Sequence, residues 1–188
     1  DEEVILYNVP EISDIYNLID IIEYLGGTCE LKNETLKINP KSIKNKLIPE
    51  ELAKKLRASY YFMGAMLGKF NKSEMFFPGG CKIGARPIDL HLKGFKKLGA
   101  TIENNEFKYL IEAKKLIGNK IYLDVASVGA TINIMLAAVK ASGTTIISNV
   151  AKEPEIVNIA TFLNNMGAKI TGAGTSEIKI VGVNKLGR

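Results

Sequence analysis

Residues 145–181, TIISNVAKEPEIVNIATFLNNMGAKITGAGTSEIKIV, contain in one piece the pattern that decides the fold. Residues 145–149 are predicted to form a short strand, and apolar residues recur at helical spacing over 154–166, which predicts a helix. Two more short apolar segments, 168–171 and 177–181, flank a glycine-rich turn, as the strands of a hairpin do. The stretch therefore predicts a unit of strand, helix and hairpin.

The start of the chain repeats this order of elements. The predicted strand, helix and two hairpin strands there are residues 5–9, 14–25, 28–31 and 35–38. Asn8, at the end of the strand, lies 18 positions before Gly26, which ends the helix, and Asn149 lies 18 positions before Gly167. This equal spacing indicates an internal structural repeat.

A middle copy has the same order but a longer connection. Its predicted strand, helix and hairpin strands are residues 74–77, 87–98, 100–103 and 107–111. From Phe77 to Gly99 is 22 positions, against 18 in the other copies, and the additional residues fall in the segment that contains Cys81. Scaffold repeats keep their length, whereas functional insertions occur in loops. The middle connection is therefore predicted to be a functional loop.

In the middle and last copies, a further helix precedes the strands predicted at 74–77 and 145–149. We predict one long helix at 49–70 and its counterpart at 129–141, the latter preceded by a strand at 120–123. The complete unit then reads βαβαββ, and the first copy lacks its beginning. Because the helices are apolar around much of their circumference, we expect helices inside and sheets outside. With 188 residues, the chain is predicted to be a single α+β domain spanning 1–188.

Composition narrows the class of protein. The chain is 46% hydrophobic and 24% charged, as is usual for a soluble globular protein. It has no apolar run near the ~20 residues that cross a bilayer, and its first residues are acidic, unlike those of a signal peptide. We therefore expect a cytoplasmic protein. Two cysteines and one histidine predict neither a disulfide framework nor a multi-histidine metal site. The net charge of +5 is scattered, which favours an acidic small molecule over nucleic acid.

The middle connection contains a thiol among cations. The turn-forming residues 78–80, PGG, precede Cys81, and Lys82 and Arg86 follow it. Cationic neighbours lower the pKa of a thiol, and Pro87 suits the first turn of a helix, whose free N–H groups attract anions. These residues indicate an active-site loop, although a lone loop cysteine is by type more often incidental.

Arginine is rare in this chain, which has 22 lysines but only Arg57, Arg86 and the terminal Arg188. The planar guanidinium binds carboxylate or phosphate through two parallel hydrogen bonds. We therefore predict that Arg86 binds an anion. For Arg57 the same role and a plain helix-surface charge remain equally open.

The segment 78–91, PGGCKIGARPIDLH, resembles the cysteine loop of the UDP-N-acetylglucosamine enolpyruvyl transferase family. The likeness extends through RAS at 57–59, SVGAT at 127–131 and EPEIV at 153–157, and covers almost the whole chain. It implies three βαβαββ units around a pseudo-threefold axis in each of two domains, of which this chain is the cysteine-loop domain and lacks the other.

The resemblance also implies a reaction and a set of site residues. Enolpyruvyl would pass from phosphoenolpyruvate to the 3′-hydroxyl of UDP-N-acetylglucosamine with release of phosphate, a step of peptidoglycan synthesis that needs no cofactor or metal. Cys81 would be the proton donor and the position alkylated by fosfomycin. The implied substrate-binding residues are Arg57, Arg86, Pro87, Ile88, Asp89, Leu90, Ser127, Val128 and Gly129.

Several residues near these motifs have simpler explanations. Asp89 suits the first turn of a helix as well as it suits a ligand, and Glu153 and Glu155 are expected to cap a helix rather than to bind substrate. His91, the single histidine, is expected to be structural, and Cys29 to belong to the core. Residues 78–85 are expected to be mobile without ligand.

Three other functions remain open at this point. One is a transferase like 5-enolpyruvylshikimate-3-phosphate synthase, against which the PGGC sequence argues, and another is a non-catalytic module that binds a nucleotide sugar or another anion. The third is a structural repeat protein with an incidental thiol. Because the family's second domain supplies a lysine, an aspartate base and a third arginine, the chain by itself is expected to fold but to be inactive.

Overall fold

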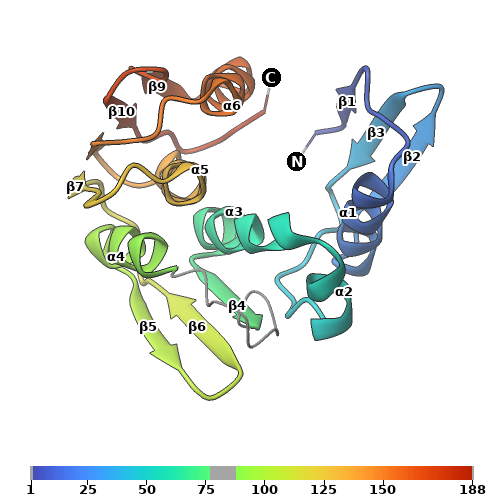
Figure 1. The fold of residues 1–188 in the computed structure, drawn as a ribbon, viewed down its shortest axis with the longest axis horizontal. Helices are drawn as coiled ribbons and strands as arrows, with labels where there is room; N and C mark the ends of the chain where they lie inside the picture. The colour runs from blue at the N-terminus through green and yellow to red at the C-terminus, as the bar shows by residue number, and fades with distance from the viewer. Residues whose placement is uncertain (1, 77–87, 188) are drawn as a thin grey trace.

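The computed structural model describes residues 2–76 and 88–187, and these residues form three groups of a sheet with its helices (Figure 1). The first group contains β1 (Val4–Leu6), α1 (Ser13–Tyr24), β2 (Thr28–Lys32) and β3 (Thr35–Asn39). Its sheet has the order β1-β3-β2 and is antiparallel throughout. The strand, helix and hairpin predicted at the start of the chain are confirmed.

The second group contains the three helical elements between residues 50 and 70 and the lengthened connection. Its elements are α2 (Glu50–Lys55), η1 (Arg57–Tyr60), α3 (Tyr61–Phe70), β4 (Lys72–Phe76), α4 (Asp89–Lys97), β5 (Thr101–Asn104) and β6 (Lys108–Glu112). The antiparallel sheet has the order β4-β6-β5. The connection predicted to be functional joins the end of β4 to the start of α4.

The third group forms the complete βαβαββ unit. It contains β7 (Lys120–Tyr122), α5 (Val128–Ala138), β8 (Thr144–Ser148), α6 (Pro154–Asn165), β9 (Lys169–Thr171) and β10 (Glu177–Val181). The sheet order is β7-β8-β10-β9, with β7 and β8 parallel and the other pairs antiparallel. A parallel pair needs a crossover connection, and α5 provides it.

Equivalent glycines mark the repeat in three dimensions. Gly26, Gly99 and Gly167 follow α1, α4 and α6 and have φ angles of 107°, 97° and 100°. Backbone in this left-handed region ends a helix and turns the chain toward the hairpin, and glycine adopts it without strain. The internal repeat predicted from the sequence therefore corresponds to the same helix-ending turn at three places in the structure.

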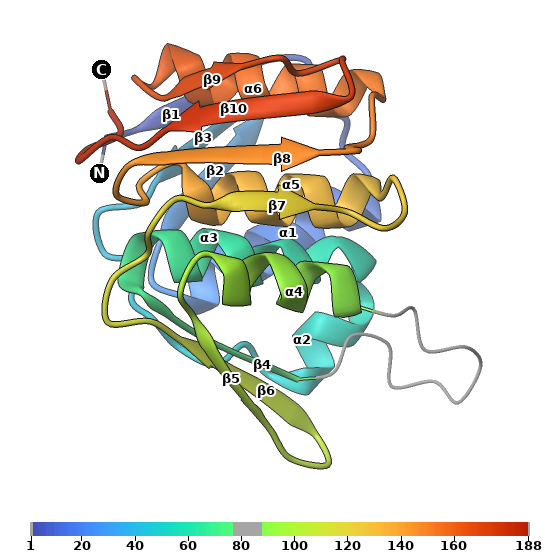
Figure 2. The same ribbon diagram turned by 90° about the vertical axis from the view of Figure 1, so that its left-hand side faces the viewer.

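The core lies where α3 and α5 pack together in the middle of the molecule (Figure 1). Helix α5 is buried along most of its length, which explains why its sequence is apolar on nearly every side. Gly64 and Gly68 bring the two backbones close, since a Cβ on Gly68 would lie 2.5 Å from the carbonyl oxygen of Leu136. In the view of Figure 2, strand β7 lies in front of α5 and strand β10 in front of α6, as the prediction of sheets outside and helices inside requires.

The prediction of a single helix over 49–70 is wrong. Leu56 has φ −128° and ψ 109°, an extended conformation that separates α2 from η1. Its side chain is buried in the core, and the hydroxyl of Ser59 donates to the carbonyl of Ala53 at 3.1 Å. Burial of Leu56 and this hydrogen bond stabilise the break. Within the described ranges, every helix is too short or too polar to cross a membrane.

Candidate active site

The start of α4, the start of α5 and the turn η1 meet on one side of the molecule. The rings of Tyr60 and His91 lie edge to face, with their centroids 5.5 Å apart. A Cβ built on Gly129 would lie 3.0 Å from Tyr60 Oη and 3.2 Å from His91 Cε1. Figure 2 shows that β4 ends on the side where α4 and α5 begin. Three segments that the sequence singled out separately are therefore neighbours.

The first turn of α5 is capped and still has free amides. Ser127 is the N-cap, and its Oγ accepts a hydrogen bond from the Ala130 N–H at 3.2 Å. The Thr131 hydroxyl donates to the Ser127 carbonyl at 2.6 Å and accepts from the Ala151 N–H at 3.3 Å. Within the described residues, the N–H groups of Val128 and Gly129 have no acceptor. These two donors, at the positive end of a helix, suit an anion.

The first turn of α4 combines packing residues with an exposed acid. Ile88 is buried at the N-cap and Leu90 packs against the core. Asp89 is exposed in the first turn, where its charge favours the helix dipole. Of the described residues 88–90, therefore, Asp89 alone presents a charged side chain to solvent.

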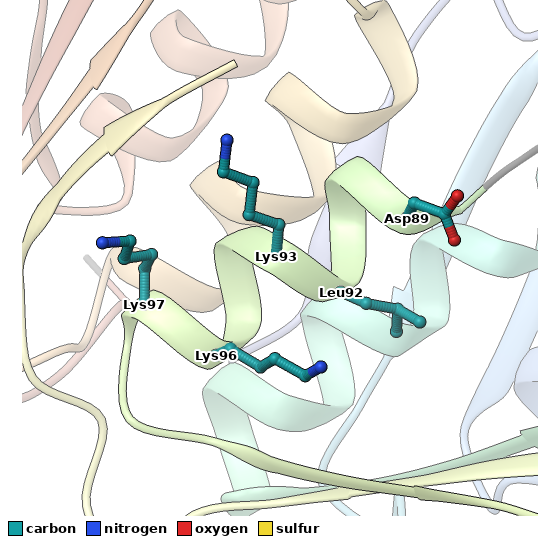
Figure 3. Close-up of a pocket in the computed structure, with 5 residues that line it drawn as sticks. All are labelled: Asp89, Leu92, Lys93, Lys96 and Lys97. Atoms are coloured by element: carbon teal, nitrogen blue, oxygen red, sulfur yellow. The ribbon is translucent and has the colours of Figure 1, made fainter. Parts of the chain in front are cut away.

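A hollow of about 440 Å³ lies along the outer face of α4 (Figure 3). Its lining residues are Asp89, Leu92, Lys93, Lys96 and Lys97. Lys93 is already paired with Asp124, the two charged atoms being 2.9 Å apart. His91 faces the protein interior instead, so the hollow and the cluster of helix starts lie on different faces of α4. Of the predicted site residues, Asp89 lines the hollow, whereas Ser127, Val128 and Gly129 do not.

Arg57 is the first residue of η1 and is exposed. It has no hydrogen bond or ion pair with any described residue. Because Tyr60 lies on the same short turn and contacts His91, η1 holds Arg57 on the side where α4 and α5 begin. A guanidinium without a protein partner is able to bind an anionic ligand.

His91 is 6% exposed, and its Nδ1 lies 2.8 Å from Asn133 Nδ2. Burial lowers the pKa of His91 from 6.5 to about 4, so the imidazole is neutral near pH 7. This agrees with the expected structural role. Neither Asn133 nor the contact of Tyr60 was predicted from the sequence, although a polar residue within the apolar run of α5 was a visible signal.

Lowering the pH from 8 to 5 is expected to reduce the free energy of unfolding by about 2 kcal/mol through His91. The unfolded chain takes up a proton near pH 6.5, whereas the folded pKa is about 4, so this loss grows as the pH falls through that interval. Urea denaturation at both pH values measures the change. In His91→Gln the pH-dependent loss should be smaller by this amount, and equal losses in the two proteins would contradict the assignment.

The start of α6 differs from expectation in one respect. Glu153 occupies the N-cap position, but its side chain makes no capping hydrogen bond, so the prediction that it caps the helix is wrong in that sense. Its φ of −58° and ψ of 151° are those of the extended residue that a following proline favours. Glu155 lies in the first turn, where it favours the helix dipole, and its charge contributes to the raised pKa of Tyr61, of which burial is the main cause.

Some predictions fall outside the described residues: these are Cys81, Arg86, Pro87 and the expected mobility of 78–85. Cys29 is half-buried on β2, and burial together with the charge of Glu23 raises the pKa of its thiol. In the described part of the chain, no group of three or more histidine, cysteine or acidic residues could hold a metal ion.

The sequence matches the family model described as EPSP synthase (3-phosphoshikimate 1-carboxyvinyltransferase) along residues 1–188. The chain is 55% identical over 186 residues to UDP-N-acetylglucosamine 1-carboxyvinyltransferase 2 of Listeria monocytogenes, covering 99% of the chain and 44% of that protein. For the protein of the same name from Bacillus subtilis the identity is 53%, covering 99% and 43%. The chain thus spans less than half the length of these relatives.

Solved structures of low sequence identity have the same fold. The enolpyruvyl transferase NikO from Streptomyces tendae has a TM-score of 0.81 at 20% identity, covering 96% of the chain and 43% of NikO. An EPSP synthase from Acinetobacter baumannii has a TM-score of 0.73 at 21% identity, covering 98% and 42%. At this identity the likeness establishes the fold and nothing more.

Proposed function

The chain belongs to the EPSP synthase family of enolpyruvyl transferases, and on that premise we propose that it is the cysteine-loop domain of a UDP-N-acetylglucosamine 1-carboxyvinyltransferase. The relatives with this name reported above are more than 50% identical to it, whereas the Acinetobacter baumannii EPSP synthase is 21% identical. The proposed reaction moves the enolpyruvyl group of phosphoenolpyruvate to the 3′-hydroxyl of UDP-N-acetylglucosamine in peptidoglycan synthesis. We expect the protein in the cytoplasm, where phosphoenolpyruvate is made.

The meeting of η1, α4 and α5 is the observation that carries this proposal. The chain leaves β4 at Phe76 and enters α4 at Asp89, after the N-cap Ile88, so the connection containing Cys81 has both ends attached to the second group. The Ser127–Gly129 amides and Arg57 lie on the side where α4 begins. A nucleotide sugar bound through its phosphates at α5 would therefore reach toward the cysteine connection.

The chemistry assigns a separate task to each group. The 3′-hydroxyl of the sugar gives its proton to a base, for which the aspartate of the second domain is proposed, and its oxygen forms a bond to C2 of phosphoenolpyruvate. At the same time C3 accepts a proton, for which Cys81 is the proposed donor. The C2–O bond to phosphate then breaks, phosphate leaves, and loss of a proton from C3 restores the double bond. Arg57 and Arg86 would balance the carboxylate and phosphate charges, and the amides of Val128 and Gly129 the diphosphate. No cofactor or metal takes part in this scheme.

The remaining groups would come from a second domain of the same protein. The chain covers 44% of the Listeria relative, which leaves room for another domain of similar size. By resemblance to the family, that domain would supply a lysine, an aspartate base and a third arginine. An epoxide phosphonate such as fosfomycin, which carries both an anion and an electrophilic carbon, would alkylate the Cys81 thiolate of the whole protein.

Phosphate release by the full-length gene product tests this function. We expect release with phosphoenolpyruvate and UDP-N-acetylglucosamine, none when shikimate 3-phosphate replaces the nucleotide sugar, and none from residues 1–188 alone. Release with shikimate 3-phosphate only would assign the alternative transferase. Binding of UDP-N-acetylglucosamine by calorimetry without any release would assign a non-catalytic module.

A further inference from the structure

Asn133 is a fully buried polar residue in the middle of α5, the most apolar helix of the chain. A buried carboxamide is costly unless its donors and acceptor are all hydrogen-bonded. Here all of them are, and the partners come from three other elements, η1, α3 and α4. The carboxamide therefore joins the three elements of the candidate site.

Two of its hydrogen bonds determine how the carboxamide is oriented. The backbone N–H of Gly64 donates to Asn133 Oδ1 at 2.9 Å, and Asn133 Nδ2 donates to the carbonyl oxygen of Tyr60 at 3.2 Å. A backbone N–H can only donate and a carbonyl can only accept, so oxygen and nitrogen cannot be exchanged. Tyr60 and Gly64 are one helical turn apart, and the carboxamide spans this turn where η1 becomes α3.

The third hydrogen bond then fixes the proton of His91. Asn133 Nδ2 lies 2.8 Å from His91 Nδ1, and because Nδ2 can only donate, Nδ1 must be the acceptor. The neutral imidazole consequently has its proton on Nε2. An imidazolium would point the N–H of Nδ1 at an N–H of Asn133 Nδ2, so two donors would face each other. Turning the carboxamide over would create two other mismatches, because Nδ2 would then face the Gly64 N–H and Oδ1 would face the Tyr60 carbonyl oxygen.

The surroundings of the ring favour the neutral form. Burial is the cause of the lowered pKa of His91, and no charged side chain contributes to it. The described groups that face the ring are the Asn133 carboxamide and Gly129 of α5 and the edge-on phenol of Tyr60 from η1. Of these, the Tyr60 phenol alone is an ionisable group, and none of them is a carboxylate, a lysine or an arginine. The Cε1 atom, between the two ring nitrogens, is the one nearest Gly129.

We propose that Asn133 is a positioning residue of the candidate site, which holds His91 as the neutral Nε2–H tautomer beside Gly129 and fixes the turn that carries Arg57. The imidazole then offers an uncharged hydrogen-bond donor at the start of α5, where the nucleotide sugar is proposed to bind. This role in substrate binding rests on the proposed function. The assignment of the Nε2–H tautomer of His91 rests only on the three hydrogen bonds of the Asn133 carboxamide.

The tautomer is measured directly in the unmodified full-length protein. Long-range ¹H–¹⁵N NMR spectra distinguish Nε2–H from Nδ1–H imidazole, and the signal of His91 is identified by its absence from His91→Gln. We expect the Nε2–H pattern throughout the range from about pH 5.5 to 8, since ordinary titration near 6.5 is suppressed. An Nδ1–H pattern, or titration near pH 6.5, would overturn the proposal. This measurement needs no turnover, so its result is independent of the proposed reaction.

Asn133→Asp tests the functional part. A carboxylate can only accept, so His91 Nδ1 should become protonated and the pKa of the ring should rise. The pH profile of kcat/KM should gain an inflection that the double variant with His91→Gln lacks. Above the raised pKa the neutral ring has its proton on Nδ1, so Nε2 no longer donates, and there KM for UDP-N-acetylglucosamine should rise about tenfold, as expected for one lost hydrogen bond. An unchanged profile and KM would refute the positioning role, and if the variant does not fold, the NMR result decides.

Asn164→Asp is the matched control. The Asn164 carboxamide also bonds both to a backbone N–H and to a carbonyl, those of Ile170, at 2.9 Å each, but it lies on α6 and contacts no histidine. The same chemical change there should leave the pH profile as it is in the unmodified protein. A new inflection in this control would show that the effect of Asn133→Asp is not specific and would also refute the proposal.

Discussion

Replacing Cys81 by alanine in the full-length gene product is expected to reduce turnover by about 10²- to 10⁴-fold, the range that a single general acid contributes. The alanine has no proton to give to C3 of phosphoenolpyruvate, while the groups proposed to bind the substrates, Arg57 and the amides of α5, are unchanged. KM should therefore change much less than kcat. A phosphate-release assay at saturating concentrations of both substrates measures the loss.

Cys29→Ala is the matched control for this substitution. Cys29 lies on β2 in the first group, is half-buried, and has a raised thiol pKa, so it is a poor nucleophile. The control should keep full turnover and full sensitivity to an epoxide phosphonate. Turnover of Cys81→Ala equal to that of Cys29→Ala would eliminate Cys81 as the proton donor.

Cys81→Asp separates proton donation from nucleophilic attack. A carboxylic acid can protonate C3, so this variant should keep more turnover than Cys81→Ala. It has no thiolate, so alkylation by the epoxide phosphonate should be lost. Equal inactivity of the two variants would indicate that the thiol has a role other than that of an acid.

The repeated fold could be predicted because its determinants are local. A strand pattern, an apolar helix face and a glycine that ends the helix lie within about forty residues of one another, and this order occurs three times. The glycines at 26, 99 and 167 adopt the same left-handed conformation, which is the physical basis of the spacing seen in the sequence. The start of α5 could be located for the same reason, since a small polar residue precedes an apolar run.

The interior of the candidate site could not be predicted, because it depends on contacts between distant residues. Asn133 meets His91, Gly64 and Tyr60 across 42, 69 and 73 positions. Helical periodicity gives the face on which a residue lies but not its partner on another helix. The break at Leu56 has a similar cause, since the tertiary burial of that side chain overrides the local preference for a continuous helix.

Gly64→Ala is expected to destabilise the fold by about 3–4 kcal/mol, the combined cost of overpacking a core and disturbing a buried hydrogen bond. A Cβ at Gly64 would collide with the backbone carbonyl oxygen of Asn133 and lie 2.6 Å from its Oδ1. Because the backbone of a buried helix cannot move aside, α3 and α5 must separate. Alanine gains about 1 kcal/mol of helix propensity, which does not offset the collision. Urea denaturation of residues 1–188 measures the change.

Two other variants identify the cause of this loss. Ala65→Gly, at the exposed neighbouring position of α3, should cost about 1 kcal/mol through propensity alone. At Gly94 of α4 a new Cβ would meet the end of the Ile134 side chain, which can change rotamer, so Gly94→Ala should cost less than Gly64→Ala. If Gly64→Ala proved as stable as the unmodified chain, α3 and α5 would not be in the close contact that also brings Asn133 to Tyr60 and His91.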